Sequence, residues 1–182
     1  MNPGVLVLVV GPSGAGKDAL IAAAREAYAA DPRYRFARRV ITRPAGPGGE
    51  QHEAATEEEF AARDFALAWR AHGLAYGIPA DVVDDVARGH VVVANVSRTV
   101  IAEAAQRFAV RVIVVTAPSH VLAARLAARG REDPADAGRR LARAVALPEA
   151  VPAETVVNDA TLAEGVARFL AALRRSWRPE VG

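Results

Sequence analysis

The chain has 182 residues, of which 52% are hydrophobic and 24% charged, a balance typical of one globular domain and unlike that of a disordered chain. It contains no cysteine, which excludes disulfides and thiolate metal sites, so the cytoplasm is the expected location. The net charge of only +2 does not indicate a nucleic-acid partner, and the apolar run Val5–Val10 is too short to span a membrane.

Predicted strands and helices alternate along the chain. The β-branched run Val5–Val10 predicts a strand, and Asp18–Ala30 predicts a helix that ends at Asp31-Pro32. A strand follows at Arg38–Thr42, then a Pro/Gly loop at Arg43–His52, a helix at Thr56–Arg63 and a strand at Phe65–Arg70. Next come a helix at Ala80–Arg88, a strand at His90–Val96, a helix at Arg98–Phe108 and a strand at Val110–Thr116. The last predicted elements are helices at Ser119–Arg129 and Pro134–Ala146, a strand at Glu154–Val157 and a helix at Leu162–Trp177.

Three of these strands contain runs of consecutive apolar residues, the pattern of parallel strands that are buried on both faces. They are Val5–Val10, His90–Val96 and Val110–Thr116. Strands that alternate with helices predict an α/β fold of three layers, in which helices cover a parallel sheet. The polar segments 33–88 and about 128–148 interrupt this alternation. We therefore expect a single domain, with a core of about 1–32, 89–127 and 149–182 and two inserted segments.

A phosphate-binding loop is predicted between the first strand and the first helix. Gly11–Lys17 fits the pattern Gly-x4-Gly-Lys in the strand-loop-helix context that this motif requires. The loop backbone forms an anion nest at the positive end of the helix, and Lys17, the only lysine in the chain, supplies a charge to the β- and γ-phosphates. The predicted ATP-binding residues of this loop are Gly11, Pro12, Ser13, Gly14, Ala15, Gly16, Lys17 and Asp18.

The residue after the lysine departs from the usual motif. A Ser or Thr whose hydroxyl reaches Mg²⁺ is typical there, and this chain has Asp18. The second deep strand ends in the neutral Asn95, where a metal-binding Asp is usual. Because a carboxylate suits a hard cation, we predict that Asp18 faces Mg²⁺ in place of the missing acid. The alternative is that Asp18 only complements the positive end of the helix.

Several segments, in order along the chain, resemble guanylate kinase. Besides the loop, they are Thr42-Arg43-Pro44, Gly73–Gly77, the arginine-rich stretch Arg125–Arg143 and Val156–Asp159. The resemblance implies a P-loop kinase fold in which 33–88 is an acceptor-binding insert and 128–148 a lid. It also implies that Asn158 lies at the nucleotide, and that Thr42, Arg43 and Tyr76 bind the acceptor.

The lid is predicted to bring arginines to the phosphates. Its candidates are Arg125, Arg129, Arg131, Arg139 and Arg140, of which at least two are expected to contact phosphate. Arg129 and Arg140 are the predicted catalytic arginines, beside Lys17. The alternative is a solvated helix face paired with neighbouring acids. The four histidines, His52, His72, His90 and His120, show no zinc-ligand spacing.

The departures from guanylate kinase favour a different acceptor. An ungapped comparison puts Arg70 where a guanine-reading Glu is expected, and an arginine, which only donates hydrogen bonds, cannot read that edge of guanine. Together with Gly-Lys-Asp18, Ile41–Pro44, Trp69–Pro79 and Asn95-x-Ser97-Arg98, the sequence is similar to the ribose 1,5-bisphosphate phosphokinases of phosphonate breakdown. The resemblance implies transfer of the γ-phosphoryl group of ATP to ribose 1,5-bisphosphate, giving 5-phosphoribosyl 1-diphosphate.

This resemblance makes Arg70, Asn95, Ser97 and Arg98 further acceptor-binding candidates. A phosphate acceptor has a second pKa near 6, so no residue is needed as a general base at pH 7. Two other hypotheses stay open: a guanylate or other nucleoside monophosphate kinase, and a guanylate-kinase-like binding module without catalysis, which the intact loop opposes. Small molecules are the expected partners, for a monomer or a homodimer without nucleic acid or membrane.

Overall fold

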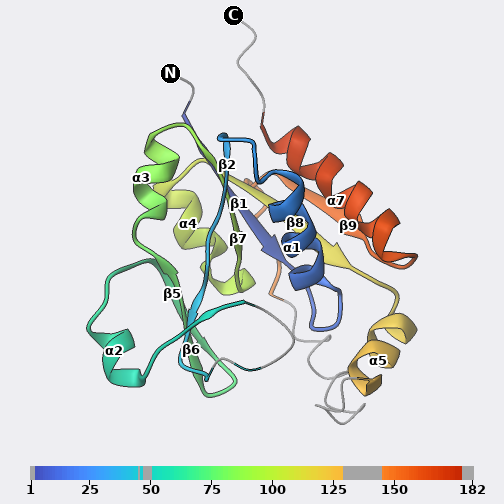
Figure 1. Ribbon diagram of the computed structural model, residues 1–182, viewed down its shortest axis with the longest axis horizontal. Coiled ribbons are helices and arrows are strands. Elements are labelled where there is room, and N and C mark those ends of the chain that lie inside the picture. The colour runs from blue at the N-terminus through green and yellow to red at the C-terminus, as the bar shows by residue number, and fades with distance from the viewer. Residues whose placement is uncertain (1–2, 45, 47–50, 129–144, 178–182) are drawn as a thin grey trace, which may run out of the picture.

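A computed structural model describes residues 3–44, 46, 51–128 and 145–177. At its centre lies a five-stranded sheet in which every neighbouring pair of strands is parallel (Figure 1). Its strands, in spatial order, are β2 (Tyr34–Phe36), β7 (Val91–Asn95), β1 (Val5–Val10), β8 (Val110–Thr116) and β9 (Ala153–Val157). The predicted parallel sheet is confirmed.

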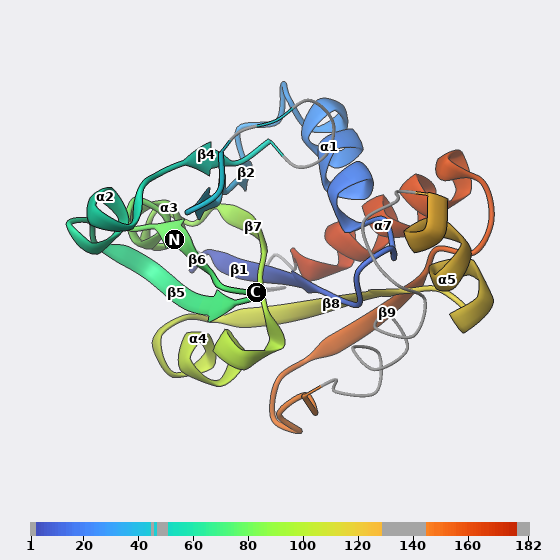
Figure 2. The same cartoon turned by 90° about the horizontal axis from the view of Figure 1, so that it is seen from below.

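Helices cover both faces of this sheet, because its central strands are apolar on both sides. Leu6 and Leu8 pack on one face, and Val7 and Val9 on the other. The Val7 face is covered by α1 (Lys17–Ala27) and α7 (Leu162–Ser176), and the Leu6 face by α3 (Val82–Ala87) and α4 (Ile101–Arg107), as Figure 2 shows. The three-layer α/β fold predicted from the sequence is therefore confirmed.

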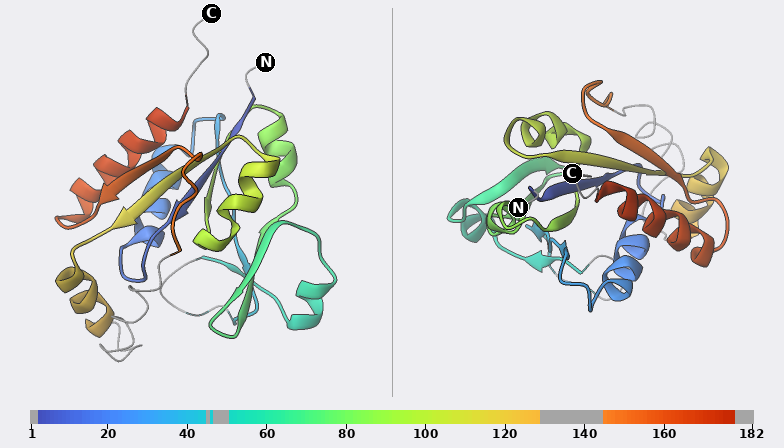
Figure 3. Two further views of the ribbon diagram at one scale, coloured as in Figure 1. Left: turned by 180° about the vertical axis from the view of Figure 1, so that it is seen from behind. Right: turned by 90° about the horizontal axis from the view of Figure 1, so that it is seen from above.

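A second, four-stranded sheet forms a lobe beside the central one. Its strands, in spatial order, are β4 (Glu53–Ala54), β3 (Val40–Ile41), β6 (Leu74–Pro79) and β5 (Phe65–Ala71), and the short helix α2 (Glu57–Ala61) belongs to the same lobe. The strands β5 and β6 form a hairpin that turns at His72 and Gly73, whose φ angles are 54° and 74°. We call this unit the acceptor lobe, after the acceptor-binding role that the sequence predicts for it. Together with α5 (Ser119–Ala128), it lies at the end of the molecule where β1 passes into α1 (Figure 3).

Several predicted boundaries change. The strands β2, β4 and β6 were not predicted, and β2 joins the central sheet although 33–88 was assigned to the insert. The helix α1 ends at Ala27 rather than Ala30, and a 3-10 turn, η1 (Arg98–Val100), precedes α4. The predicted helix at Pro134–Ala146 lies outside the described residues except at its end, which is not helical. Within the described ranges, no helix has the length and apolar character needed to cross a membrane.

Candidate active site

The phosphate-binding loop lies between β1 and α1, as predicted. Gly11 and Gly16 have φ angles of 148° and 89°, a region that L-residues rarely adopt. A Cβ atom at Gly11 would lie 2.0 Å from the carbonyl oxygen of Val115, so the loop passes too close to β8 for any side chain. Lys17 Nζ donates to the carbonyl oxygens of Gly11 at 2.6 Å and of Pro12 at 3.1 Å, which holds the ammonium group across the loop.

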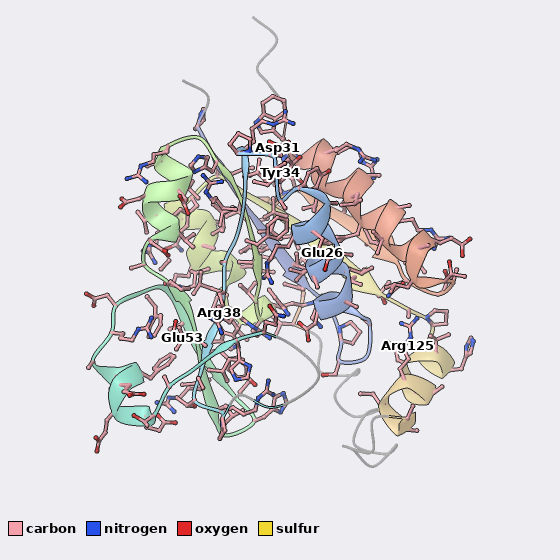
Figure 4. The ribbon with its side chains drawn as sticks, in the orientation of Figure 1. Glu26, Asp31, Tyr34, Arg38, Glu53 and Arg125 are labelled. Atoms are coloured by element: carbon pink, nitrogen blue, oxygen red, sulfur yellow. The ribbon has the colours of Figure 1, made fainter. Side chains whose placement is uncertain are left out.

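The loop is supported from outside by Asn158 and Arg125. The side chain of Asn158 is buried, and its Nδ2 donates to the carbonyl oxygen of Ala15 at 2.8 Å. Arg125, on α5 (Figure 4), donates to the carbonyl oxygens of Gly14 at 3.2 Å and Asn158 at 2.8 Å. One arginine therefore joins α5, the phosphate loop and the turn after β9. Of the predicted lid arginines, Arg125 alone lies within the described residues; Arg129, Arg131, Arg139 and Arg140 lie outside them.

Asp18 and Asn95, the two residues that depart from the usual metal-binding pattern, contact each other. The pairing of β1 with β7 sets Val9 beside Asn95, at the carboxyl end of both strands. Asn95 is 7% exposed, and its Nδ2 donates to Asp18 Oδ1 at 2.9 Å. This contact orients the Asp18 carboxylate at the first turn of α1, next to Lys17. Among the described residues, no group of three or more His, Cys, Asp or Glu side chains gathers in a metal-binding arrangement. Since Mg²⁺ bound with a nucleotide needs only one or two protein oxygens, Asp18 and Asn95 are compatible with it.

The acceptor lobe divides the predicted acceptor residues between its two faces. Trp69 pairs with Tyr76 across the hairpin, so these two side chains share one face. Arg70 pairs with Ala75 and therefore lies on the opposite face. Thr42 shares that opposite face, since it exchanges hydrogen bonds with Ala75, including one from the Ala75 N–H to Thr42 Oγ1 at 2.8 Å. The structure thus does not bring Arg70 together with Tyr76.

Arg70 is engaged by the helix α2. Its guanidinium donates to both carboxylate oxygens of Glu57, at 3.3 Å and 2.9 Å, and 67% of the Arg70 side chain is exposed. The hydrogen bonds from Arg70 lower the pKa of Glu57, and those to Glu57 raise the pKa of Arg70. An exposed pair of this kind contributes little to stability, so its main effect is to hold Arg70 toward α2.

Three other candidates lie at chain turns around the site. Arg43 directly follows Thr42, and its carbonyl oxygen accepts a hydrogen bond of 2.9 Å from Nε2 of the buried His52, which joins the two ends of the predicted Pro/Gly loop. Ser97 Oγ accepts from the N–H of Thr99 at 3.3 Å and caps η1. Arg98 donates to the carbonyl oxygen of Val145 at 3.1 Å. The structure gives the backbone of Arg43 and the side chains of Ser97 and Arg98 local contacts, and it does not itself test the predicted role of these residues at the acceptor.

Three aromatic contacts in the acceptor lobe were not predicted from the sequence. The rings of Trp69 and Tyr76 are stacked, with centroids 5.4 Å apart and planes at 4°. The guanidinium carbon of Arg39 lies 5.4 Å from the Tyr76 ring centroid and 6.0 Å from that of Trp69. The alternation of side chains along the predicted strand Arg38–Thr42 could have placed Arg39 with Ile41 on one face. Only the pairing of β3 with β6 shows that this is the face of Tyr76.

Comparison with known proteins gives close relatives. No family model matches the sequence. The chain is 52% identical over 172 residues to the ribose 1,5-bisphosphate phosphokinase PhnN of Acidiphilium cryptum, a match that covers 94% of this chain and 93% of that protein. It is 54% identical over 181 residues to the bifunctional ribose 1,5-bisphosphokinase-thymidine phosphorylase of Cupriavidus necator. That match covers 96% of this chain but only 30% of the longer protein.

The fold has a solved counterpart. A guanylate kinase from Anaplasma phagocytophilum superposes with a TM-score of 0.70 at 18% identity, over 98% of this chain and 89% of that one. At this identity the likeness establishes the fold alone, and it agrees with the P-loop kinase fold expected from the motifs. Because it matches the Acidiphilium protein at 52% identity over nearly the whole length of both, the chain belongs to the ribose 1,5-bisphosphate phosphokinase family.

Proposed function

We propose that this chain transfers the γ-phosphoryl group of ATP to ribose 1,5-bisphosphate and forms 5-phosphoribosyl 1-diphosphate. The observation that carries the proposal is the identity of about half of all residues to relatives that are named for this activity, over nearly their whole length. The phosphate loop with Lys17 supports it independently, since this loop is the polyphosphate site that a kinase requires.

The reaction needs no general base. A phosphate oxygen of the acceptor attacks the γ-phosphorus of ATP and forms the new P–O bond. The bond from the γ-phosphorus to its bridging oxygen breaks, and ADP leaves with that electron pair. Because the attacking phosphate is already largely a dianion at pH 7, the protein's task is to bring two polyanions together and to stabilise the charge on the oxygens in transfer.

The donor side of this task falls to the phosphate loop. The backbone of Gly11–Gly16 and the positive end of α1 hold the β- and γ-phosphates, and the Lys17 ammonium stabilises the charge on the leaving oxygen. Mg²⁺ bound together with ATP would neutralise part of the phosphate charge. Asp18, oriented by Asn95, is the side chain we propose to face that ion.

The acceptor side is assigned to residues of the acceptor lobe, the end of β7 and the lid. The proposed acceptor-binding residues are Thr42, Arg43, Arg70, Tyr76, Asn95, Ser97 and Arg98, and the proposed catalytic lid arginines are Arg129 and Arg140. Of these, Arg70 has the least geometric support, because it faces α2 and not Tyr76. We further propose that the protein works in the cytoplasm as a monomer or a homodimer.

The test is ATP-dependent ADP release with ribose 1,5-bisphosphate, with GMP and without an acceptor, combined with ³¹P NMR of the product. We expect a diphosphate product and ADP in equal amounts with ribose 1,5-bisphosphate. Turnover with GMP alone would assign the chain to the nucleoside monophosphate kinases. No turnover with any acceptor would favour a binding module.

A further inference from the structure

The acceptor lobe presents one of its two sheet faces to the central sheet. Leu67 and Ile78 pair across the hairpin on the same face as Trp69 and Tyr76. Both are buried in the core cluster that includes Val96 and the helices α3 and α4. The strand β5 also contacts η1, which follows the carboxyl end of β7. The face that carries Trp69 and Tyr76 is therefore turned toward that end of the central sheet.

The same end of the central sheet carries the donor site. Asn95 is the last residue of β7, and it donates to Asp18 at the start of α1. The Trp69 face of the lobe thus lies toward the same end of the central sheet as Asn95 and Asp18. Side chains on the other face, Arg70 among them, are directed toward α2. A cation that serves the acceptor is expected on the Trp69 face.

Arg39 is an arginine on that face. Its carbonyl oxygen accepts a 2.8 Å hydrogen bond from the N–H of Glu53, which fixes the backbone where β3 begins. Arg39 is half-buried, and its guanidinium lies over the rings of both Trp69 and Tyr76, which are nearly parallel to each other. Cation–π contacts with two rings restrict the side chain, so it loses less conformational freedom when it binds an anion.

We propose that Arg39 binds a phosphate group of the acceptor and contributes to its selection, an inference that rests on the proposed function. The planar guanidinium can donate two parallel hydrogen bonds to phosphate oxygens, a bidentate contact that a lysine cannot make. In the same position, it occupies the aromatic surface on which a flat base would otherwise stack. The phosphate of a sugar bisphosphate would contact the Arg39 guanidinium at this position, whereas a nucleotide base would have to displace the guanidinium from the rings.

The test compares Arg39→Gln and Arg39→Lys with the unmodified protein and a matched control, Arg63→Gln. Arg63 also lies in the acceptor lobe, with its guanidinium over the Phe65 ring at 5.7 Å and an ion pair to Glu53. We expect Arg39→Gln to raise the KM for ribose 1,5-bisphosphate by about 10- to 150-fold, the loss typical of a charged hydrogen bond. The KM for ATP should change by less than about twofold. Arg39→Lys should fall in between, and Arg63→Gln should match the unmodified protein.

An unchanged KM for ribose 1,5-bisphosphate in Arg39→Gln would overturn the proposal, as would an equal rise in the KM for ATP. If Arg39→Gln does not fold, as judged by its circular dichroism melt, the KM values of Arg39→Lys for ribose 1,5-bisphosphate and for ATP are compared in the same way. If the unmodified protein does not turn over ribose 1,5-bisphosphate, the proposed function fails by itself. Calorimetric titration with ribose 1,5-bisphosphate then tests Arg39 separately: an equal Kd for Arg39→Gln, or no binding to the unmodified protein, refutes its role.

Discussion

The contact between Asp18 and Asn95 makes a prediction for Asp18→Asn. The substitution keeps the shape of the side chain, and its Oδ1 can still accept from Asn95 Nδ2 at 2.9 Å, now as a neutral hydrogen bond. A charged hydrogen bond contributes ~1.5–3 kcal/mol and a neutral one ~0.5–1.5 kcal/mol, so we expect a stability loss of about 1 kcal/mol. For a chain of this length that corresponds to a fall in Tm of roughly 2–4 °C.

The effect on Mg²⁺ should be larger than the effect on stability. Unit charges about 4 Å apart interact by ~4 kcal/mol at an effective dielectric constant of 20, and desolvation offsets part of this. A remaining loss of ~1.4 kcal/mol would raise the Mg²⁺ concentration at half-maximal rate about tenfold. The assay is the initial rate at saturating ATP and acceptor with Mg²⁺ titrated.

Asp84→Asn is the matched control for this prediction. It removes an acidic residue from the first turn of α3, away from the phosphate loop. We expect it to leave the Mg²⁺ dependence unchanged. If Asp18→Asn also leaves that dependence unchanged and lowers only Tm, Asp18 acts on the positive end of α1 and the metal role is refuted.

Three further substitutions test other parts of the site. Lys17→Ala should lower kcat by at least about 10²-fold with little change in Tm, because a transition-state charge contact is lost; a near-normal kcat would contradict the role of Lys17. Arg125→Gln should raise the KM for ATP but not for the acceptor, since the phosphate loop loses the hydrogen bond to Gly14; an unchanged KM for ATP would show that this support is dispensable. Arg70→Gln should raise the acceptor KM less than Arg39→Gln does, because Arg70 faces α2. The reverse order would make Arg70 the principal acceptor arginine.

The parts of the structure that depend on local sequence could be predicted. The phosphate loop is a contiguous motif between an apolar strand and an Ala-rich helix, and it lies where the motif requires. The apolar runs of β1, β7 and β8 indicated strands buried on both faces. The strand β2 was missed, because three residues with two half-buried side chains carry no such signal.

The parts that depend on contacts distant in sequence could not be predicted in the same way. Asn95 is 77 residues from Asp18, and Arg125 is 111 residues from Gly14, so neither contact follows from local spacing. The orientation of Arg70 likewise depends on contacts beyond its local sequence. The turn at His72 and Gly73 sets the register of the hairpin, and this register pairs Trp69 with Tyr76 and turns Arg70 away.

The central claim is that the acceptor is a sugar bisphosphate and not a nucleotide. The most direct measurement is kcat/KM of the unmodified protein for ribose 1,5-bisphosphate and for GMP, each at saturating ATP and Mg²⁺. We predict efficient turnover of ribose 1,5-bisphosphate and little or none of GMP, since the face toward the donor site carries an arginine on two aromatic rings. A higher kcat/KM for GMP would contradict this account and make the chain a guanylate kinase in function.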